Sequence, residues 1–335
     1  INNLSTGFQS NALITFGAAA PATKVTATTD ISGFDATKIK ALTVAEAAAL
    51  TTEQVSSIST SAMAGLTAGQ LGALSATNVA AFTDQQMGAF TNTQIAAFKP
   101  AQIGAMTSSQ INSLSTSQVG ALSVTQVASL NVSRIKDIDS TRLGALSSKQ
   151  IQALTTDQIV NLIADQLGSM STSQVASLKV AQVAALETRD LLGMTTTQVA
   201  ALTATQVKAL KANQLQALTT DQIQAIETDD LASMTATQVA AFASAQVRAL
   251  STTQLNALTV AELNALSDTQ LQALSTAQVS ALSTTSTAKL KSTQVAALTT
   301  AQIASLTTAQ VVALTTDQIA ALTTDQLAEI GRASC

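Results

Sequence analysis

The feature that most constrains this chain is an eight-residue unit that recurs without insertion or deletion. Residues 34–329 form 37 successive octads, and the last two read LTTDQIAA and LTTDQLAE. Numbering each octad from its leucine, position 1 is apolar in all 37 and position 6 is Val, Ile, Leu or Met in 35. Position 5 is Gln in 27 octads, and position 2 is Ser, Thr, Asp or Asn in 29. A short, strictly phased repeat predicts a stacked array in place of several globular domains.

The period of eight excludes one continuous helix. At about 100° per residue, eight residues advance the leucine by roughly 80°, so an apolar stripe would wind around the whole helix and no partner could bury it. A strand is also disfavoured, because positions 1 and 6 fall on opposite faces of a strand and because Ala, Gln and Leu favour helix.

A helix that begins afresh in every octad explains the pattern. Thr or Ser at position 2 and Gln at position 5 form the S/T-x-x-Q capping box, in which each side chain accepts a hydrogen bond from the other residue's backbone N–H. Positions 1 and 6 then flank the cap as a hydrophobic staple. Pro100 falls at position 3, the first helical residue, where proline is best tolerated. We therefore predict one capped helix of about six residues per octad.

Helices this short must be stacked to be stable, because isolated helices below about 12–15 residues are marginal in water. The expected fold is all-α, a solenoid of short capped helices in which each coil contacts the coils before and after it. The number of octads per coil stays open. Glycines recur every 16 residues at position 7, whereas ETRDLLGM and ETDDLASM lie 40 residues apart, an odd number of octads. Three octads per coil would give a body roughly 120 Å long.

The two ends of the chain fall outside the repeat. Residues 1–33 include a strand-like segment, Ala12–Phe16, and a β-branched segment, Val25–Thr29. We expect this small irregular or β region to be either a cap on the first coil or an arm that docks on a neighbouring copy. Residues 330–335, IGRASC, form a non-repeat tail that resembles a translated sequencing adapter, which would make the tail an artefact; a genuine tail is the alternative.

Composition argues against several classes of function. The chain has no His, one Cys at its last position and no glycine-rich phosphate loop, so we expect neither enzymatic activity nor a cofactor or metal. Charged residues make up 11% of the chain and the net charge is −4, which disfavours nucleic-acid binding. No run of 18 apolar residues is present, so membrane insertion is not expected.

Some residues depart from the repeat and are candidates for contacts between subunits. The densest charge cluster comprises Arg134, Lys136, Asp137, Asp139 and Arg142. It is interpreted either as a lateral docking patch or, more in keeping with ordinary surfaces, as a solvated face with internal ion pairs. Phe8 and Phe16 in the N-terminal segment are the other candidates for intersubunit contacts.

The unit L-T-x-x-Q-[VI]-x-A resembles the octad arrays of long, repetitive bacterial surface and adhesin-like proteins, over residues 34–329. The resemblance implies an extracellular structural protein: a filament subunit, surface fibre or adhesin stalk whose main partner is a further copy of itself. The alternative is a binding module that presents a repetitive Thr/Gln-lined face to a glycan, ice or a protein. Surface glycans are therefore a second expected partner.

Overall fold

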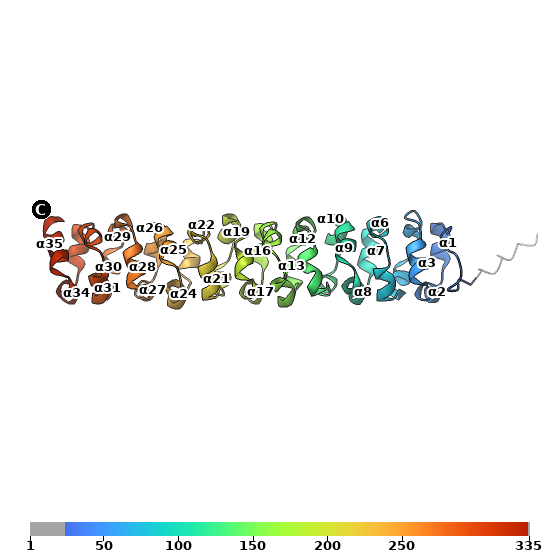
Figure 1. Cartoon of the computed structure of the whole chain (residues 1–335), viewed down its shortest axis with the longest axis horizontal. Helices are drawn as coiled ribbons and strands as arrows, with labels where there is room; N and C mark the ends of the chain where they lie inside the picture. The colour runs from blue at the N-terminus through green and yellow to red at the C-terminus, as the bar shows by residue number, and fades with distance from the viewer. Residues whose placement is uncertain (1–23, 334–335) are drawn as a thin grey trace, which may run out of the picture.

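In the computed structural model, which describes residues 24–333, the chain is a long, straight rod of short helices (Figure 1). Each of the 37 octads contributes one helix, 35 of them α-helices and two, η1 and η2, 3-10 helices. The described residues contain no strand. The predicted all-α solenoid is therefore confirmed.

Three octads make one coil, because each helix packs against the helices three octads before and after it. The helices consequently stack in three columns along the rod. The first column holds α1 (Ala36–Ala41), η1 (Met63–Gly65), α6 (Asp84–Ala89), α9 (Ser108–Ser113), η2 (Val132–Asp137), α14 (Thr156–Val160), α17 (Val180–Ala185), α20 (Ala204–Val207), α23 (Thr228–Leu231), α26 (Thr252–Ala257), α29 (Thr276–Ala281), α32 (Thr300–Ala304) and α35 (Thr324–Ala333).

The second column begins at the next octad. It holds α2 (Val44–Ala48), α4 (Ala68–Ala73), α7 (Asn92–Ala97), α10 (Thr116–Gly120), α12 (Ser140–Gly144), α15 (Ala164–Gly168), α18 (Thr188–Leu191), α21 (Ala212–Ala217), α24 (Ala236–Ala240), α27 (Val260–Leu263), α30 (Thr284–Lys289) and α33 (Thr308–Ala313).

The third column completes each coil. It holds α3 (Thr52–Ser57), α5 (Ala76–Ala80), α8 (Pro100–Ala105), α11 (Val124–Ala128), α13 (Ser148–Ala153), α16 (Thr172–Ser177), α19 (Thr196–Ala200), α22 (Thr220–Gln224), α25 (Ser244–Ala249), α28 (Asp268–Ala273), α31 (Ser292–Ala297) and α34 (Thr316–Ala321). All three columns run without a gap from the first coil to the last.

The predicted capping box begins most of these helices. At α32 the Thr299 hydroxyl accepts a hydrogen bond from the Gln302 N–H at 3.2 Å, and Gln302 Oε1 accepts one from the Thr299 N–H at 2.8 Å. Pro100 is the first residue of α8, as the sequence predicted. The helix ends because position 1 leaves the helical region. Leu298, which follows α31, has φ −62° and ψ 145°, and its N–H closes the last turn on the Val295 carbonyl at 3.2 Å.

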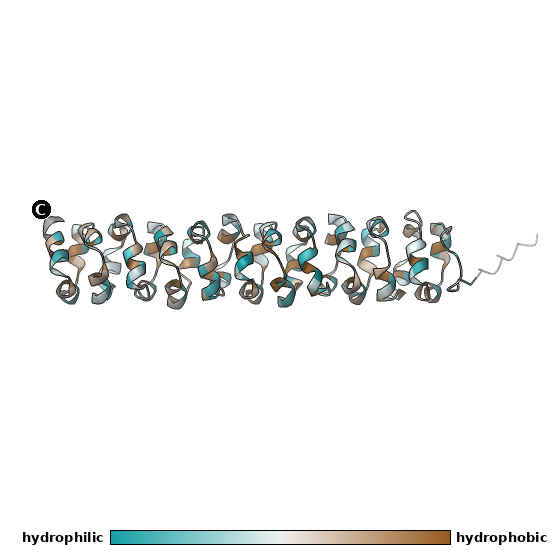
Figure 2. Cartoon of the chain, in the orientation of Figure 1, coloured by the Kyte–Doolittle hydropathy of each residue, from teal (hydrophilic) through white to brown (hydrophobic). Residues whose placement is uncertain are grey.

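The core is a single aliphatic column built from positions 1 and 6. Nearly all of these side chains are buried, and hydrophobic and hydrophilic segments are interspersed along the whole rod in Figure 2. The position 1 side chains of a coil meet inside it. Phe90 contacts Phe82 and Phe98 edge to face, with ring centroids 5.2 and 5.3 Å apart, and the three rings come from the three octads of one coil.

Residues 24–33 cover the first coil and are irregular. Val25 and Ile31 are buried in the core, and the Thr29 N–H donates to the Thr26 carbonyl in a turn. Gln54 Nε2 donates to the Thr26 and Thr29 carbonyls, both at 2.8 Å. The segment Val25–Thr29 is thus a turn and not a strand, while Ala12–Phe16 lies outside the described residues.

The last described helix runs past the repeat. α35 continues through Ile330 to Ala333, so the chain does not break its helix at position 1 there as it does in the other octads. No helix in residues 24–333 is both long enough and apolar enough to cross a membrane.

Candidate functional site

The position 5 glutamines are the most distinctive polar feature, and all 27 are buried. This finding corrects one part of the expected binding face, since the repeated Gln cannot line the surface of the rod. The threonine and serine residues at positions 3 and 4 are mostly exposed, whereas position 2 hydroxyls are used in caps.

Each buried glutamine from Gln70 onward also links two coils, while Gln54 bonds to the N-terminal segment. Gln302 Nε2 donates to the Leu271 carbonyl at 2.8 Å and to the Leu274 carbonyl at 2.7 Å, 31 and 28 residues earlier. Both carbonyls lie where α28 ends. The Leu271 carbonyl also accepts from the Leu274 N–H at 3.1 Å, and Leu274 itself is the residue that ends the helix. One amide therefore satisfies the start of its own helix with its oxygen and the end of an earlier helix with its nitrogen. We call the rows of these contacts the glutamine ladder.

Four octads in which lysine replaces the capping hydroxyl still make the glutamine hydrogen bonds to the preceding coil. At Lys99, Lys179, Lys211 and Lys291 no side chain caps the helix. The backbone N–H of each lysine still donates to the glutamine oxygen, at 2.6–3.1 Å. Half of the capping box and both contacts between coils survive, which explains why the array tolerates these substitutions.

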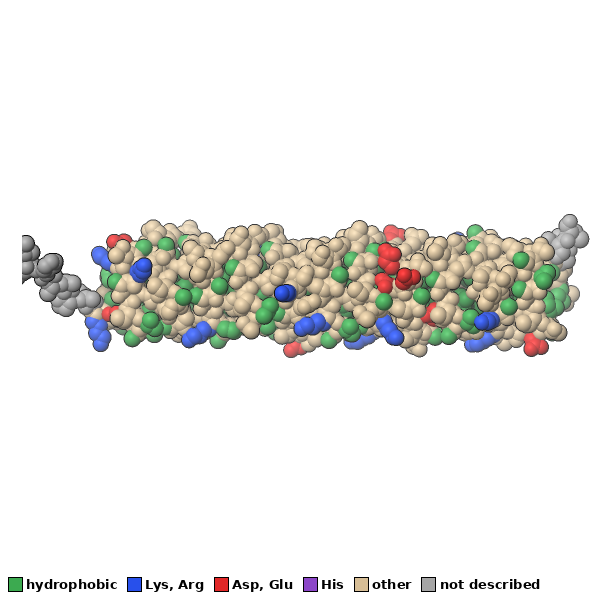
Figure 3. Space-filling view, turned by 180° about the vertical axis from the view of Figure 1, so that it is seen from behind, with side chains coloured by type: hydrophobic (Ala, Val, Ile, Leu, Met, Phe, Trp, Pro, Cys, Tyr) green, Lys and Arg blue, Asp and Glu red, His purple; other side chains and the backbone are tan. Residues whose placement is uncertain are grey.

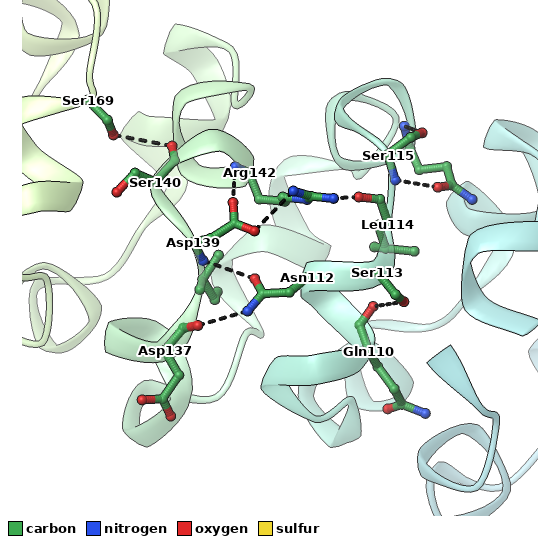
Figure 4. A network of polar contacts seen from close by, with 12 residues as sticks. Gln110, Asn112, Ser113, Leu114, Ser115, Asp137, Asp139, Ser140, Arg142 and Ser169 are labelled. Carbon is green, nitrogen blue, oxygen red and sulfur yellow. Dashed lines mark hydrogen bonds and ion pairs between the residues drawn. The ribbon is translucent and has the colours of Figure 1, made fainter. Parts of the chain in front are cut away.

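Two arginines replace the glutamine in the predicted charge cluster, and each bonds to the carbonyl 28 residues earlier. Figure 4 shows the Arg142 contact. Arg134 Nη1 donates to the Met106 carbonyl at 2.5 Å, and Arg142 Nε donates to the Leu114 carbonyl at 3.0 Å. Asp139 accepts from the Arg142 N–H at 2.8 Å and pairs with its guanidinium at 3.0 Å. These three side chains are therefore used inside the chain.

The remaining members of the cluster are on the surface. Lys136 and Asp137 are exposed. Asn112 of the preceding coil donates to the Asp137 carbonyl and accepts from the Asp139 N–H, both at 2.9 Å. The ion pair is the arrangement expected of a solvated face, and a lateral contact through Lys136 and Asp137 stays a prediction. Phe8 and Phe16 lie outside the described residues.

Polar residues at positions 7 and 8 add further bonds between coils. At position 7, Asn256 Nδ2 donates to the Ala281 carbonyl at 2.7 Å and Gln272 Nε2 donates to the Ala297 carbonyl at 2.9 Å, each 25 residues ahead. At position 8, Ser129 Oγ donates to the Pro100 carbonyl at 2.7 Å, 29 residues back. Several neighbouring coils are thus bonded on the outside as well as in the core.

The outer surface is mostly uncharged, with scattered single charges and one visible group of carboxylates (Figure 3). Within residues 24–333 no three acidic, Cys or His side chains gather as metal ligands. A groove of about 560 Å³ at the first coil is lined by Lys24, Val25, Ala41, Thr43, Ala45, Glu46 and Ala49. Hydrogen bonds from the Thr43 and Val25 N–H groups lower the pKa of Glu46, so this carboxylate acts as an acceptor for the N-terminal segment.

Sequence reasoning missed the second role of the glutamine and the number of octads per coil. The buried amides bond across 28 and 31 residues, and no local pattern reports that distance. One signal was available: Phe82, Phe90 and Phe98 are consecutive at position 1, and these three large residues share one coil.

Comparison with known families gives one match. A family described as ALTTAQ repeat matches five segments, residues 95–132, 183–220, 223–260, 255–284 and 287–324, which together cover just over half of the chain. No curated protein matches the chain.

Proposed function

Because the chain belongs to the ALTTAQ repeat family, we propose that it is an elongated structural protein, a stalk or filament subunit displayed outside the cell. The observation that carries the proposal is the continuity of the glutamine ladder and of the core. Each column is unbroken from the first coil to the last, and the buried amides bond almost every coil to its predecessor. Such a body holds its two ends at a fixed separation.

The repeat favours length over recognition. In 27 of the 37 octads the position 5 glutamine makes its hydrogen bonds inside the rod, and neighbouring octads have nearly the same exposed residues. In a solenoid the stability is approximately a sum of units and interfaces between them, so length changes by whole octads without redesign. A spacer benefits from this property, because its reach scales with the number of coils.

The proposed function predicts where the protein is and what it looks like there. Antibody labelling of intact and permeabilised source cells, followed by negative-stain electron microscopy of the released protein, tests both points. We expect labelling of intact cells and straight rods. Rods joined end to end would assign a filament subunit, and single rods projecting from the surface would assign a stalk. Labelling only after permeabilisation, with compact particles, would contradict the proposal.

A further inference from the structure

We propose that Asp190 is a proton-operated link between two coils of the rod. Its carboxyl group bonds α18 to the preceding coil when it carries a proton and leaves that bond unmade when it is ionised. The inference is independent of where the protein is located or what it is attached to.

Asp190 occupies position 5, where other octads place the ladder glutamine. By the spacing of the glutamine contacts, the carbonyls that correspond to this position are those of Ile159 and Leu162, 31 and 28 residues earlier. An ionised carboxylate only accepts hydrogen bonds, so it cannot supply the donor that these carbonyls receive from glutamine elsewhere. Asp190 is only 3% exposed, and its Oδ2 is buried without a hydrogen-bond partner. The hydrogen bond between coils is therefore absent at this octad, although a side chain that could donate it when protonated is present.

Asn78 shows that a side chain of this length reaches across the coils. It also occupies position 5, is as long as an aspartate, and its Nδ2 donates to the Leu50 carbonyl at 2.7 Å, 28 residues earlier. A protonated Asp190 has one O–H donor. By the same geometry that O–H reaches the Leu162 carbonyl, so protonation restores the bond to the residue at position 1.

Burial and the charged groups around Asp190 determine whether its pKa is raised or lowered. On its own helix, Arg189 Nε lies 3.4 Å from Asp190 Oδ1, and the same guanidinium pairs with Glu187 at 3.1 Å. On the two helices packed against α18, the titratable residues are Asp165 in α15 and Lys211 beside α21, and both are exposed. Burial raises the pKa of Asp190, Arg189 opposes that change and Glu187 adds to it.

The direction in which stability changes with pH follows from the proton affinities of Asp190 in the folded and unfolded states. Because the pKa of Asp190 is raised in the folded protein, the native state binds the proton more readily than the unfolded chain. The stabilisation is complete below the ordinary pKa of aspartate and is lost as pH rises through the raised value. Lowering the pH therefore stabilises the contact between α18 and the preceding coil.

The octad around Asp190 has little else to hold it. Glu187 makes no side-chain cap, and Asp190 does not accept from its backbone as glutamine does, so α18 lacks both halves of the capping box. The octad with Asp230 also has Glu at position 2 and Asp at position 5, and burial, Glu227 and Asp229 raise the pKa of that carboxyl as well. Local opening of α18 should thus respond to the state of one side chain.

Hydrogen exchange of the full chain, read by mass spectrometry on the peptide spanning residues 187–194, tests the proposal. Its sequence ETRDLLGM occurs once, which makes the peptide assignable among repeats. After correction for intrinsic rates, protection in the wild type should fall several-fold between pH 4 and pH 7. Asp190→Asn, a permanent donor, should keep the acid level of protection at both pH values, and Asp190→Gln should do the same.

Asp221→Asn, at an exposed position of α22, is the matched control and should leave the pH dependence unchanged. Circular dichroism checks that each variant is folded. An equal pH dependence in the wild type, Asp190→Asn and Asp190→Gln would overturn the proposal. Weaker protection of both variants than of the wild type at pH 4 would also overturn it.

Discussion

The amide nitrogen of Gln158 lies 2.8 Å from the carbonyl oxygen of Leu130, a residue 28 positions earlier in the chain. Gln158 is completely buried, and its nitrogen also reaches the Val127 carbonyl at 3.1 Å while its oxygen accepts from the Thr155 N–H at 2.8 Å. One neutral side chain thus satisfies three main-chain groups at the boundary between coils. Buried groups of this kind are costly to leave unpaired.

Replacing Gln158 by methionine, which has a similar length, should destabilise the coil by about 2–4 kcal/mol, because the Thr155 N–H and the Val127 and Leu130 carbonyls lose their side-chain partner. Hydrogen exchange of α14 and of α11, which contains Val127, measures the local loss. Thr156→Ala, at the exposed position 3 of the same octad, should change the stability by less than about 0.5 kcal/mol. Equal effects of the two substitutions would contradict the role of the ladder.

Glu262 offers the reverse experiment, because it replaces a ladder glutamine and is 2% exposed. Its carboxylate accepts from the Thr259 N–H at 2.5 Å but brings no amide donor to the Leu231 and Met234 carbonyls. Glu262→Gln should therefore raise the free energy of unfolding of this coil by about 1 kcal/mol, measured by denaturant titration or exchange. Glu53→Gln, on the surface of α3, should have little effect. A neutral or destabilising Glu262→Gln would show that the amide nitrogen contributes nothing.

Two glycines should respond to alanine with opposite signs. A Cβ added at Gly65 would lie 2.1 Å from the Ala36 carbonyl oxygen, so Gly65→Ala should cost about 1–3 kcal/mol by forcing η1 away from α1. A Cβ at Gly120 meets nothing within 4 Å, and Gly120→Ala should stabilise α10 by about 0.5–1 kcal/mol. Thermal unfolding of both variants measures the difference. The same sign for both would contradict the close approach of the first coils.

Adding a capping hydroxyl to a helix that lacks one should stabilise the protein. Lys179 begins α17 without a side-chain cap, so Lys179→Thr should raise stability by about 0.5–2 kcal/mol. Lys149→Thr makes the same chemical change at an exposed position inside α13 and should bring no gain. A gain of equal size at both positions would point to lost charge and not to capping.

The local part of the fold was predictable because its causes lie within one octad. The capping box, the staple between positions 1 and 6 and the place of Pro100 involve residues at most five apart, and each was confirmed. Local rules of this kind fix where every helix begins and ends.

The arrangement of coils was not predictable in the same way. The chain completes one coil after three octads because of contacts between residues about 24–31 apart. The similarities visible in the sequence have other spacings: the glycines recur every 16 residues, and ETRDLLGM and ETDDLASM lie 40 residues apart. Arg134 and Arg142 illustrate the consequence. They read as surface charges in sequence, yet their guanidinium groups bond to carbonyls 28 residues away.

Small-angle X-ray scattering distinguishes a straight rod with three octads per coil from other arrangements of the chain. We expect a radius of gyration of about 35 Å for a rod about 120 Å long, against about 20 Å for a globular chain of this size. Deleting residues 194–265, nine whole octads, should shorten the maximum dimension by about 30 Å, at about 10 Å per coil. A shortening of about 45 Å, as two octads per coil would give, or a compact globule, would rule out three octads per coil.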